Sequence, residues 1–260
     1  MTDIHHPSRW KFQSPDEPGF HEVITPENSP CKITWIYRLN LDKGTSFALN
    51  NDNLELNGAV VQGEVSLSHE EKKTALDRLD SFYLPAGHTV NIEAAEDTII
   101  FIGGSLYEGK GIFFTRKYDL NLPLGDIHQV RGEPPYKREV FMTLAQQDEA
   151  SRLICGITIG EKGQWTSWPP HQHSEELEEV YCYFDIPAPK KAFHYASRKA
   201  GVFEYIHQVS TGDCVAIPEG YHPNCGMPGV KIAYFWVMAA HQPETRRYDL
   251  AVNDPVFDKL

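Results

Sequence analysis

The sequence predicts an all-β protein, folded as a sandwich or barrel. Short runs rich in β-branched and aromatic residues follow one another along the chain. Clusters of glycine, proline, asparagine or aspartate separate these runs, and helical periodicity is weak. The strands that this pattern predicts most clearly cover residues 33–39, 58–63, 98–102, 152–159, 179–186 and 231–238.

Two segments are exceptions to the strand pattern. Residues 69–79 fit a short helix, with Lys72, Lys73 and Asp77 on its solvated face. A short helical turn is also expected near the C-terminus. Between the strands, residues 119–137 are rich in proline, glycine and charge, which predicts a linker there.

Three histidines and an acidic pair form the most informative pattern in the chain. His171 and His173 stand two residues apart, so in an extended strand their side chains share a face. The pair Glu178 and Glu179 then enters an aromatic strand, and a later Pro-x-Gly-x-His turn supplies His222. Three neutral imidazoles and one carboxylate suit a divalent first-row metal and can leave a coordination position open. The pattern predicts a metal site.

A weak repeat indicates two related β domains. Residues 81–88 and 213–222 both read as a strand followed by Pro-x-Gly and a histidine. Only the second copy has a His-x-His pair upstream. We therefore predict an N-terminal domain without metal over residues 1–130 and a metal-binding domain over residues 131–260. His88, in the first copy, is expected to be a turn residue.

Composition argues against several classes of protein. Asp and Glu number 36 against 24 Lys and Arg, so the net charge of −12 disfavours nucleic-acid binding. A few local basic residues can still attract a small anion. The five cysteines are odd in number and include no Cys-x-x-Cys, which argues against a disulfide framework and a zinc ribbon. Most of them lie in apolar, strand-like runs and are expected to be small buried hydrophobes.

Targeting signals are not apparent. The first fourteen residues are polar and lack the apolar core of a signal peptide. The longest apolar run, residues 232–240, is too short to span a bilayer. We expect a soluble cytoplasmic protein without a membrane partner. A glycine-rich phosphate cradle is also absent from the sequence, so a nucleotide cofactor is not expected.

These motifs resemble the two signatures of the cupin β-barrel. More narrowly, the chain is similar to the 5-deoxy-glucuronate isomerases of inositol catabolism, which group with the 5-keto-4-deoxyuronate isomerases of pectin breakdown. The similarity to the pectin branch lies in residues 179–187, and that to the inositol branch in residues 218–223. The segments that carry the resemblance are Pro169-Pro170-His171-Gln172-His173, Leu177-Glu178-Glu179-Val180-Tyr181, Pro218-Glu219-Gly220-Tyr221-His222-Pro223 and Val237-Met238-Ala239.

The resemblance implies a bicupin, two tandem jelly-roll barrels with a single metal in the C-terminal one. It further implies a homo-oligomer and aldose–ketose isomerisation of a small sugar acid. The first candidate substrate is 5-deoxy-glucuronate, and 5-keto-4-deoxyuronate is the alternative. The metal would be one divalent ion such as Zn, Mn, Fe or Ni, because this ligand set does not distinguish them.

Carried over residue by residue, the resemblance gives His171, His173 and His222 as metal ligands. Alignment on the following Val-Tyr makes Glu179 the carboxylate ligand, whereas the usual gap after His173 makes it Glu178. Adjacent strand residues face opposite ways, so only one of them can reach the metal. We favour Glu179, because a loop absorbs an insertion more easily than a strand changes register.

Three tyrosines are candidates for moving the proton. If Glu179 points inward, Tyr181 and Tyr183 do so as well, and Tyr221 lies beside His222. A substrate carboxylate would need an arginine or lysine partner, for which Arg152 is one candidate.

Two other functions fit the same ligands. An Fe(II)-dependent cupin dioxygenase could use the same residues for oxygen chemistry. A non-catalytic sugar-binding cupin is the third hypothesis, although a binder has no need of a metal with an open position.

Overall fold

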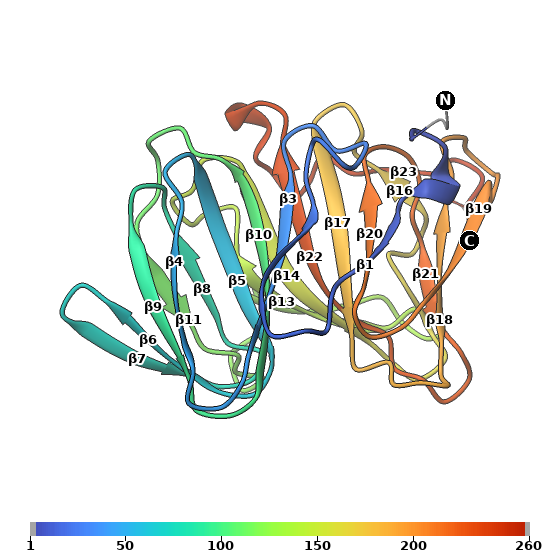
Figure 1. The fold of residues 1–260 in the computed structure, drawn as a ribbon. Helices are drawn as coiled ribbons and strands as arrows, with labels where there is room; N and C mark the ends of the chain where they lie inside the picture. The colour runs from blue at the N-terminus through green and yellow to red at the C-terminus, as the bar shows by residue number, and fades with distance from the viewer. Residues whose placement is uncertain (1–3, 258–260) are drawn as a thin grey trace.

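The computed structural model describes residues 4–257, and their regular secondary structure is almost entirely antiparallel β-sheet (Figure 1). Two short 3-10 turns, η1 (Pro7–Arg9) and η2 (Pro243–Thr245), are the helical elements of this part of the chain. The second of them confirms the turn expected near the C-terminus. No helix among these residues is long and apolar enough to cross a bilayer.

The N-terminal half contains a large sheet and a small one. The large sheet runs in the order β11 (Phe114–Arg116), β8 (Ser81–Leu84), β5 (Leu54–Gln62), β10 (Thr98–Leu106), β3 (Trp35–Leu41) and β2 (Gly19–Ile24). The small sheet runs β4 (Ser46–Asn50), β9 (Thr89–Ala94), β6 (Val65–His69) and β7 (Lys72–Leu76). A shared apolar core includes Leu39, Leu67, Ile92, Ile100 and Ile102.

The C-terminal half repeats this arrangement. Its large sheet runs β1 (Lys11–Gln13), β20 (Asp213–Ile217), β17 (Leu177–Phe184), β22 (Ala233–Ala240), β14 (Leu153–Gly160), β13 (Arg138–Leu144) and β12 (His128–Arg131). Its small sheet runs β15 (Trp165–Thr166), β21 (Asn224–Gly226), β18 (Ala192–Ala196) and β19 (Tyr205–Val209). A separate two-stranded ribbon joins β16 (His171–Gln172) to β23 (Val252–Asn253).

The sequence repeat has a structural counterpart. The order β8-β5-β10-β3 in one half matches β20-β17-β22-β14 in the other, and the two repeated segments supply β8 and β20. All six strands expected from the sequence are present, as β3, β5, β10, β14, β17 and β22. The boundary near residue 130 stays a prediction. Figure 1 shows β1, far before that residue, beside β20 of the C-terminal half. The strand β12, which spans residue 130, pairs with β13 in the same sheet.

The helix predicted over residues 69–79 is wrong. The segment is part of a β-hairpin in which Val65 on β6 pairs with Leu76 on β7. Glu70 turns the chain in the left-handed conformation, with a φ of 52°. Val65, Leu67 and Leu76 are buried by this pairing, and that burial outweighs the local helical pattern.

The two large sheets pack against each other in the middle of the molecule. The strands β10 and β22 approach so closely that a Cβ on Gly103 would lie 2.5 Å from a methyl group of Val237. Phe101 of β10 joins a core cluster with Ile154 and Phe235 of the other half. The cysteines are all free and four are buried, as expected: Cys31, Cys155, Cys182 and Cys214.

Two buried glutamates tie the halves together in a reciprocal way. Glu55, the second residue of β5, accepts hydrogen bonds from the backbone N–H groups of residues 151–153 at distances of 2.5–2.8 Å. Glu178, the second residue of β17, accepts hydrogen bonds from the N–H groups of Lys32 and Ile33, both at 2.8 Å. The Thr34 hydroxyl donates to the same carboxylate at 2.7 Å. Each half thus supplies a carboxylate that caps the start of the equivalent strand in the other.

The substitution Glu55→Gln should lower the free energy of unfolding by about 1–3 kcal/mol, because an amide NH₂ would face the buried N–H groups of residues 151–153 where a carboxylate oxygen now accepts from them. Urea denaturation of the full chain measures this loss. The exposed Glu71→Gln is the matched control and should unfold at the same midpoint as the unaltered protein. Equal midpoints for both variants would contradict a stabilising role for Glu55.

Candidate metal centre

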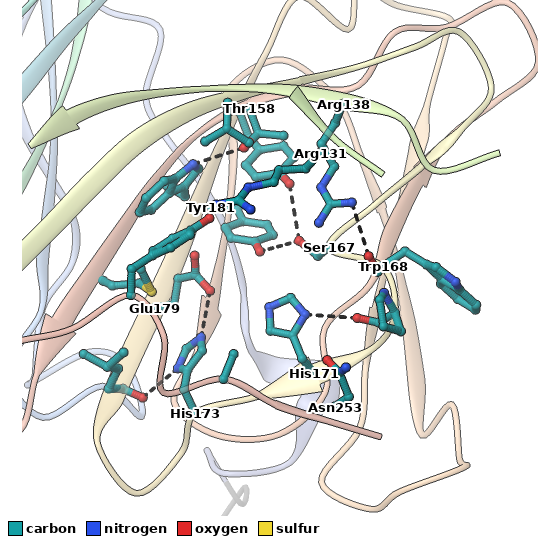
Figure 2. Close-up of a pocket in the computed structure, with 18 of the residues that line it drawn as sticks. Arg131, Arg138, Thr158, Ser167, Trp168, His171, His173, Glu179, Tyr181 and Asn253 are labelled. Atoms are coloured by element: carbon teal, nitrogen blue, oxygen red, sulfur yellow. Dashed lines mark hydrogen bonds and ion pairs between the residues drawn. The ribbon is translucent and has the colours of Figure 1, made fainter. Parts of the chain in front are cut away.

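A cavity of about 400 Å³ lies inside the C-terminal half. One of its walls is the inward face of the large sheet, where Tyr181 pairs with Trp236 and Tyr234 pairs with Thr158 across neighbouring strands. Glu179 occupies the same face, paired with Met238. His171 and His173 line the cavity too, and Figure 2 shows both imidazoles turned toward its interior.

Local structure fixes the position of each histidine. The ribbon β16–β23 holds His171 opposite Asn253, and His173 follows directly. His222 comes from the Pro-x-Gly-x-His turn after β20. There Gly220 has a φ of 85°, and a Cβ on it would lie 2.2 Å from the Ser197 carbonyl oxygen. Only glycine fits this turn, so the motif reflects a backbone requirement.

All three imidazoles are held in the same tautomer. The Nδ1–H groups of His171, His173 and His222 donate to the carbonyl oxygens of Pro169, Leu177 and Gly220 at 3.0, 3.1 and 2.9 Å. A carbonyl oxygen can only accept, so each Nδ1 must carry a hydrogen. In the neutral ring the lone pair then lies on Nε2, as a metal ligand requires.

Three of the predicted ligands converge on one point. Oε2 of Glu179 lies 3.1 Å from His173 Nε2 and 3.2 Å from His222 Nε2. Ligand atoms that share an ion at about 2.1 Å are separated by roughly 3.0–3.4 Å, so this spacing fits a metal. The His222 Nε2 atom is buried and makes no hydrogen bond with residues 4–257, which leaves it available to a metal. His171 stands close by, its ring centroid 4.8 Å from that of His222.

The protonation states also suit a cation. Burial and the neighbouring imidazoles of His222 and His173 lower the pKa of His171 to about 3. Burial would raise the pKa of Glu179, but the imidazoles of His173 and His222 beside its carboxylate outweigh burial and bring this pKa to about 2. At neutral pH the cavity therefore contains a neutral His171 and an ionised Glu179.

The two adjacent glutamates face opposite ways. Glu179 points into the cavity, whereas the carboxylate of Glu178 is engaged by residues 32–34 of the other half. Both side chains are buried and each has its own set of partners. The register of β17 thus separates the pair as strand geometry requires.

The three candidate tyrosines occupy different surroundings. Tyr181 lines the cavity, and its hydroxyl lies 2.6 Å from Ser167 Oγ. Tyr183 is buried, with its hydroxyl 2.7 Å from His194 Nδ1, and Tyr221 is half-buried beside His222. Neither Tyr183 nor Tyr221 is among the described residues that line the cavity. Burial first, and then the charge of Glu179, raises the pKa of Tyr181 well above its usual value, so its phenol stays protonated.

The cations of the cavity were missed by the sequence analysis. Arg152, the candidate partner for a carboxylate, lies elsewhere, where it pairs with Glu108 and donates to the carbonyls of Ala240 and His241. The arginines that line the cavity are Arg131 and Arg138. Arg131 lies within the segment interpreted as a linker, residues 119–137, and Arg138 directly follows it. The alternation of Arg138, Val140 and Met142 along a strand could have placed Arg138 on the inward face.

Comparison with known proteins adds independent information. The chain matches the model of the KduI/IolB family over residues 10–260. It is 26% identical over 244 residues to a 5-deoxy-glucuronate isomerase of Geobacillus kaustophilus, covering 87% of this chain and 86% of that protein. It is 25% identical over 257 residues to a 5-deoxy-glucuronate isomerase of Bacillus subtilis, covering 92% and 91% of the two chains.

Solved structures with the same fold include an IolB-like protein of Salmonella typhimurium. It superposes with a TM-score of 0.84 at 20% identity, over 96% of this chain and 98% of that chain. An oxalate decarboxylase superposes with a TM-score of 0.59 at 13% identity, over 94% and 79% of the chains. These similarities confirm the predicted all-β bicupin fold class. Because the family match covers nearly the whole sequence, the chain belongs to the KduI/IolB family.

Proposed function

We propose that the protein is a metal-dependent aldose–ketose isomerase of a sugar acid, with 5-deoxy-glucuronate as the first candidate substrate. The observation that carries this proposal is the convergence of Glu179 with the Nε2 atoms of His173 and His222 in a cavity of about 400 Å³. The curated relatives named 5-deoxy-glucuronate isomerase, such as that of Geobacillus kaustophilus, support the reaction class. We keep 5-keto-4-deoxyuronate as the alternative substrate.

In this proposal one divalent ion is held by His171, His173, Glu179 and His222. The Nδ1 hydrogen bonds keep the three imidazoles in the ligating tautomer, and Glu179 supplies the anionic ligand. When bound, the ion would act as a Lewis acid on adjacent substrate oxygens. Zn, Mn, Fe and Ni all accept this ligand set.

Isomerisation moves a proton between two neighbouring carbons of the substrate. We assign to Tyr181 the hydrogen bond to a substrate oxygen during this step. Its hydroxyl lies on the cavity wall, and the contact with Ser167 fixes its direction. Because its phenol stays protonated, Tyr181 would donate a hydrogen bond to a substrate oxygen rather than act as a base. Roles for Tyr183 and Tyr221 stay predictions, as do the cytoplasmic location and the homo-oligomer.

The variant His222→Ala should lose bound metal and activity, because the cluster would lose one of its two nitrogens closest to Glu179. Elemental analysis of the purified protein measures the metal, and circular dichroism checks the fold. Adding excess metal should restore little activity. Full metal occupancy in this variant would show that the ligands lie elsewhere.

The variants Glu179→Gln and Glu178→Gln should separate two functions of one strand. Glu179→Gln removes the anionic ligand and should weaken metal binding by at least about 10-fold, in line with losses seen when a metal site is disturbed. Glu178→Gln should bind metal normally but unfold at lower urea concentration, because its partners are backbone amides of the other half. The reversed pattern would make Glu178 the ligand.

The chemistry itself is tested without oxygen or nucleotide. Metal-loaded protein should interconvert the aldose and ketose forms of 5-deoxy-glucuronate, read by NMR under anaerobic conditions. In deuterated water, deuterium should appear at the carbon that gains hydrogen unless the transferred proton is shielded from solvent. Turnover of 5-keto-4-deoxyuronate but not of 5-deoxy-glucuronate would identify the alternative substrate as the correct one. A chain that requires oxygen would instead be the Fe(II)-dependent dioxygenase, and one that turns over no uronate at all would be the non-catalytic binder.

A further inference from the structure

The carboxylates that line the cavity have partners of opposite or neutral charge, whereas its guanidinium groups form no ion pair within residues 4–257. Its two carboxylates both have cationic or imidazole partners, since Glu179 faces His173 and His222, and Asp249 pairs with Arg247. Its two guanidinium groups, on Arg131 and Arg138, donate to neutral oxygens and form no ion pair within the described part of the chain. Glu139, next to Arg138 in the sequence, pairs instead with His128, whose Nε2 lies 2.7 Å from Oε1 of Glu139.

The two arginines also stand directly opposite each other. Arg131 on β12 and Arg138 on β13 are register partners across the antiparallel pair. Like charges in this position repel and destabilise the pairing. The repulsion would fall if an anion lay between or beside the two groups.

Arg138 is already oriented for such a contact. Its Nη1 group donates to the carbonyl oxygens of Tyr136 and Trp168, both at 3.2 Å. Its Nε and Nη2 donors have no partner among residues 4–257. Arg131 is similar, with its Nε bonded to Gln129 Oε1 at 2.8 Å and its terminal nitrogens unbonded within the same range. In Figure 2 both guanidinium groups enter the cavity from the side away from His171 and His173.

We propose that Arg138, assisted by Arg131, is the specificity-determining site that binds the carboxylate of the substrate. A guanidinium offers parallel N–H donors that match the two oxygens of a carboxylate. The substrate would then lie across the cavity, with its acid group at the arginines and its carbonyl end at the histidine cluster. This inference rests on the proposed function, because it assigns the second end of the same substrate.

The test compares an acid with its neutral counterpart and does not require turnover. Metal-loaded protein is titrated with D-glucuronate and with D-glucose by isothermal titration calorimetry. Arg138→Gln should weaken glucuronate binding about 10- to 100-fold and leave glucose binding unchanged. Arg138→Lys should recover only part of the loss, because it keeps the charge but not the planar fork. Arg131→Gln should cause a smaller loss in the same direction.

The matched control is Lys137→Gln, which makes the same change of charge one residue away and outside the lining of this cavity. It should bind glucuronate as the unaltered protein does. Metal content and melting temperature of each variant without ligand are measured as checks of the fold.

The outcomes separate this inference from the proposed function. If glucuronate binds equally well to Arg138→Gln and to the unaltered protein, the carboxylate site is wrong, whatever the isomerase assay gives. An equal loss of glucose binding would overturn it too, since glucose has no carboxylate that Arg138 could bind. If Arg138→Gln selectively loses glucuronate while no isomerisation is found, the carboxylate site stands and the isomerase proposal fails.

Discussion

The register of β17 is the constraint on which both the fold and the site depend. Glu178 reaches out of its own half to accept hydrogen bonds from residues 32–34, which fixes the strand along its axis. Its neighbour Glu179 must then face the opposite way, toward His173 and His222. A shift of one residue would remove the contact of Glu178 with the other half and the carboxylate of Glu179 from the cavity in the same step. Stability and chemistry are therefore linked through one strand.

The internal repeat shows why the buried cluster of His173, Glu179 and His222 belongs to the C-terminal half. Glu55 occupies in β5 the position that Glu178 occupies in β17, and both cap the start of a strand in the other half. The residue after each glutamate differs, since Leu56 stands where Glu179 stands in the second half. Leu56 packs in the apolar core of the N-terminal half. The structural tie is thus present in both halves, while the inward-facing carboxylate is present in one.

Sequence patterns predict best where the signal is local. The six central strands are dense in β-branched and aromatic residues, and glycine at position 220 is required by the turn that presents His222. The hairpin at residues 65–76 could not be predicted, because its stability comes from burial of Leu67 and Leu76 against other strands. The role of Glu178 was also hidden, because its partners lie about 145 residues earlier in the chain. The edge strand β12 lies in the segment interpreted as a linker. Its own residues do not indicate a strand, because its stability comes from pairing with β13.

Net charge and local charge act in opposite directions in this protein. With a net charge of −12, the molecule as a whole repels an anionic sugar at long range, although salt screens that repulsion beyond roughly 10 Å. Inside the cavity, the guanidinium groups of Arg131 and Arg138, which form no ion pair with residues 4–257, reverse the sign of the field at one end. At the other end Glu179 keeps a negative charge that only a cation can balance. A molecule with an acid group at one end and oxygens for a metal at the other has one orientation that satisfies both. The cavity can therefore orient such a substrate through its charges before any chemical step.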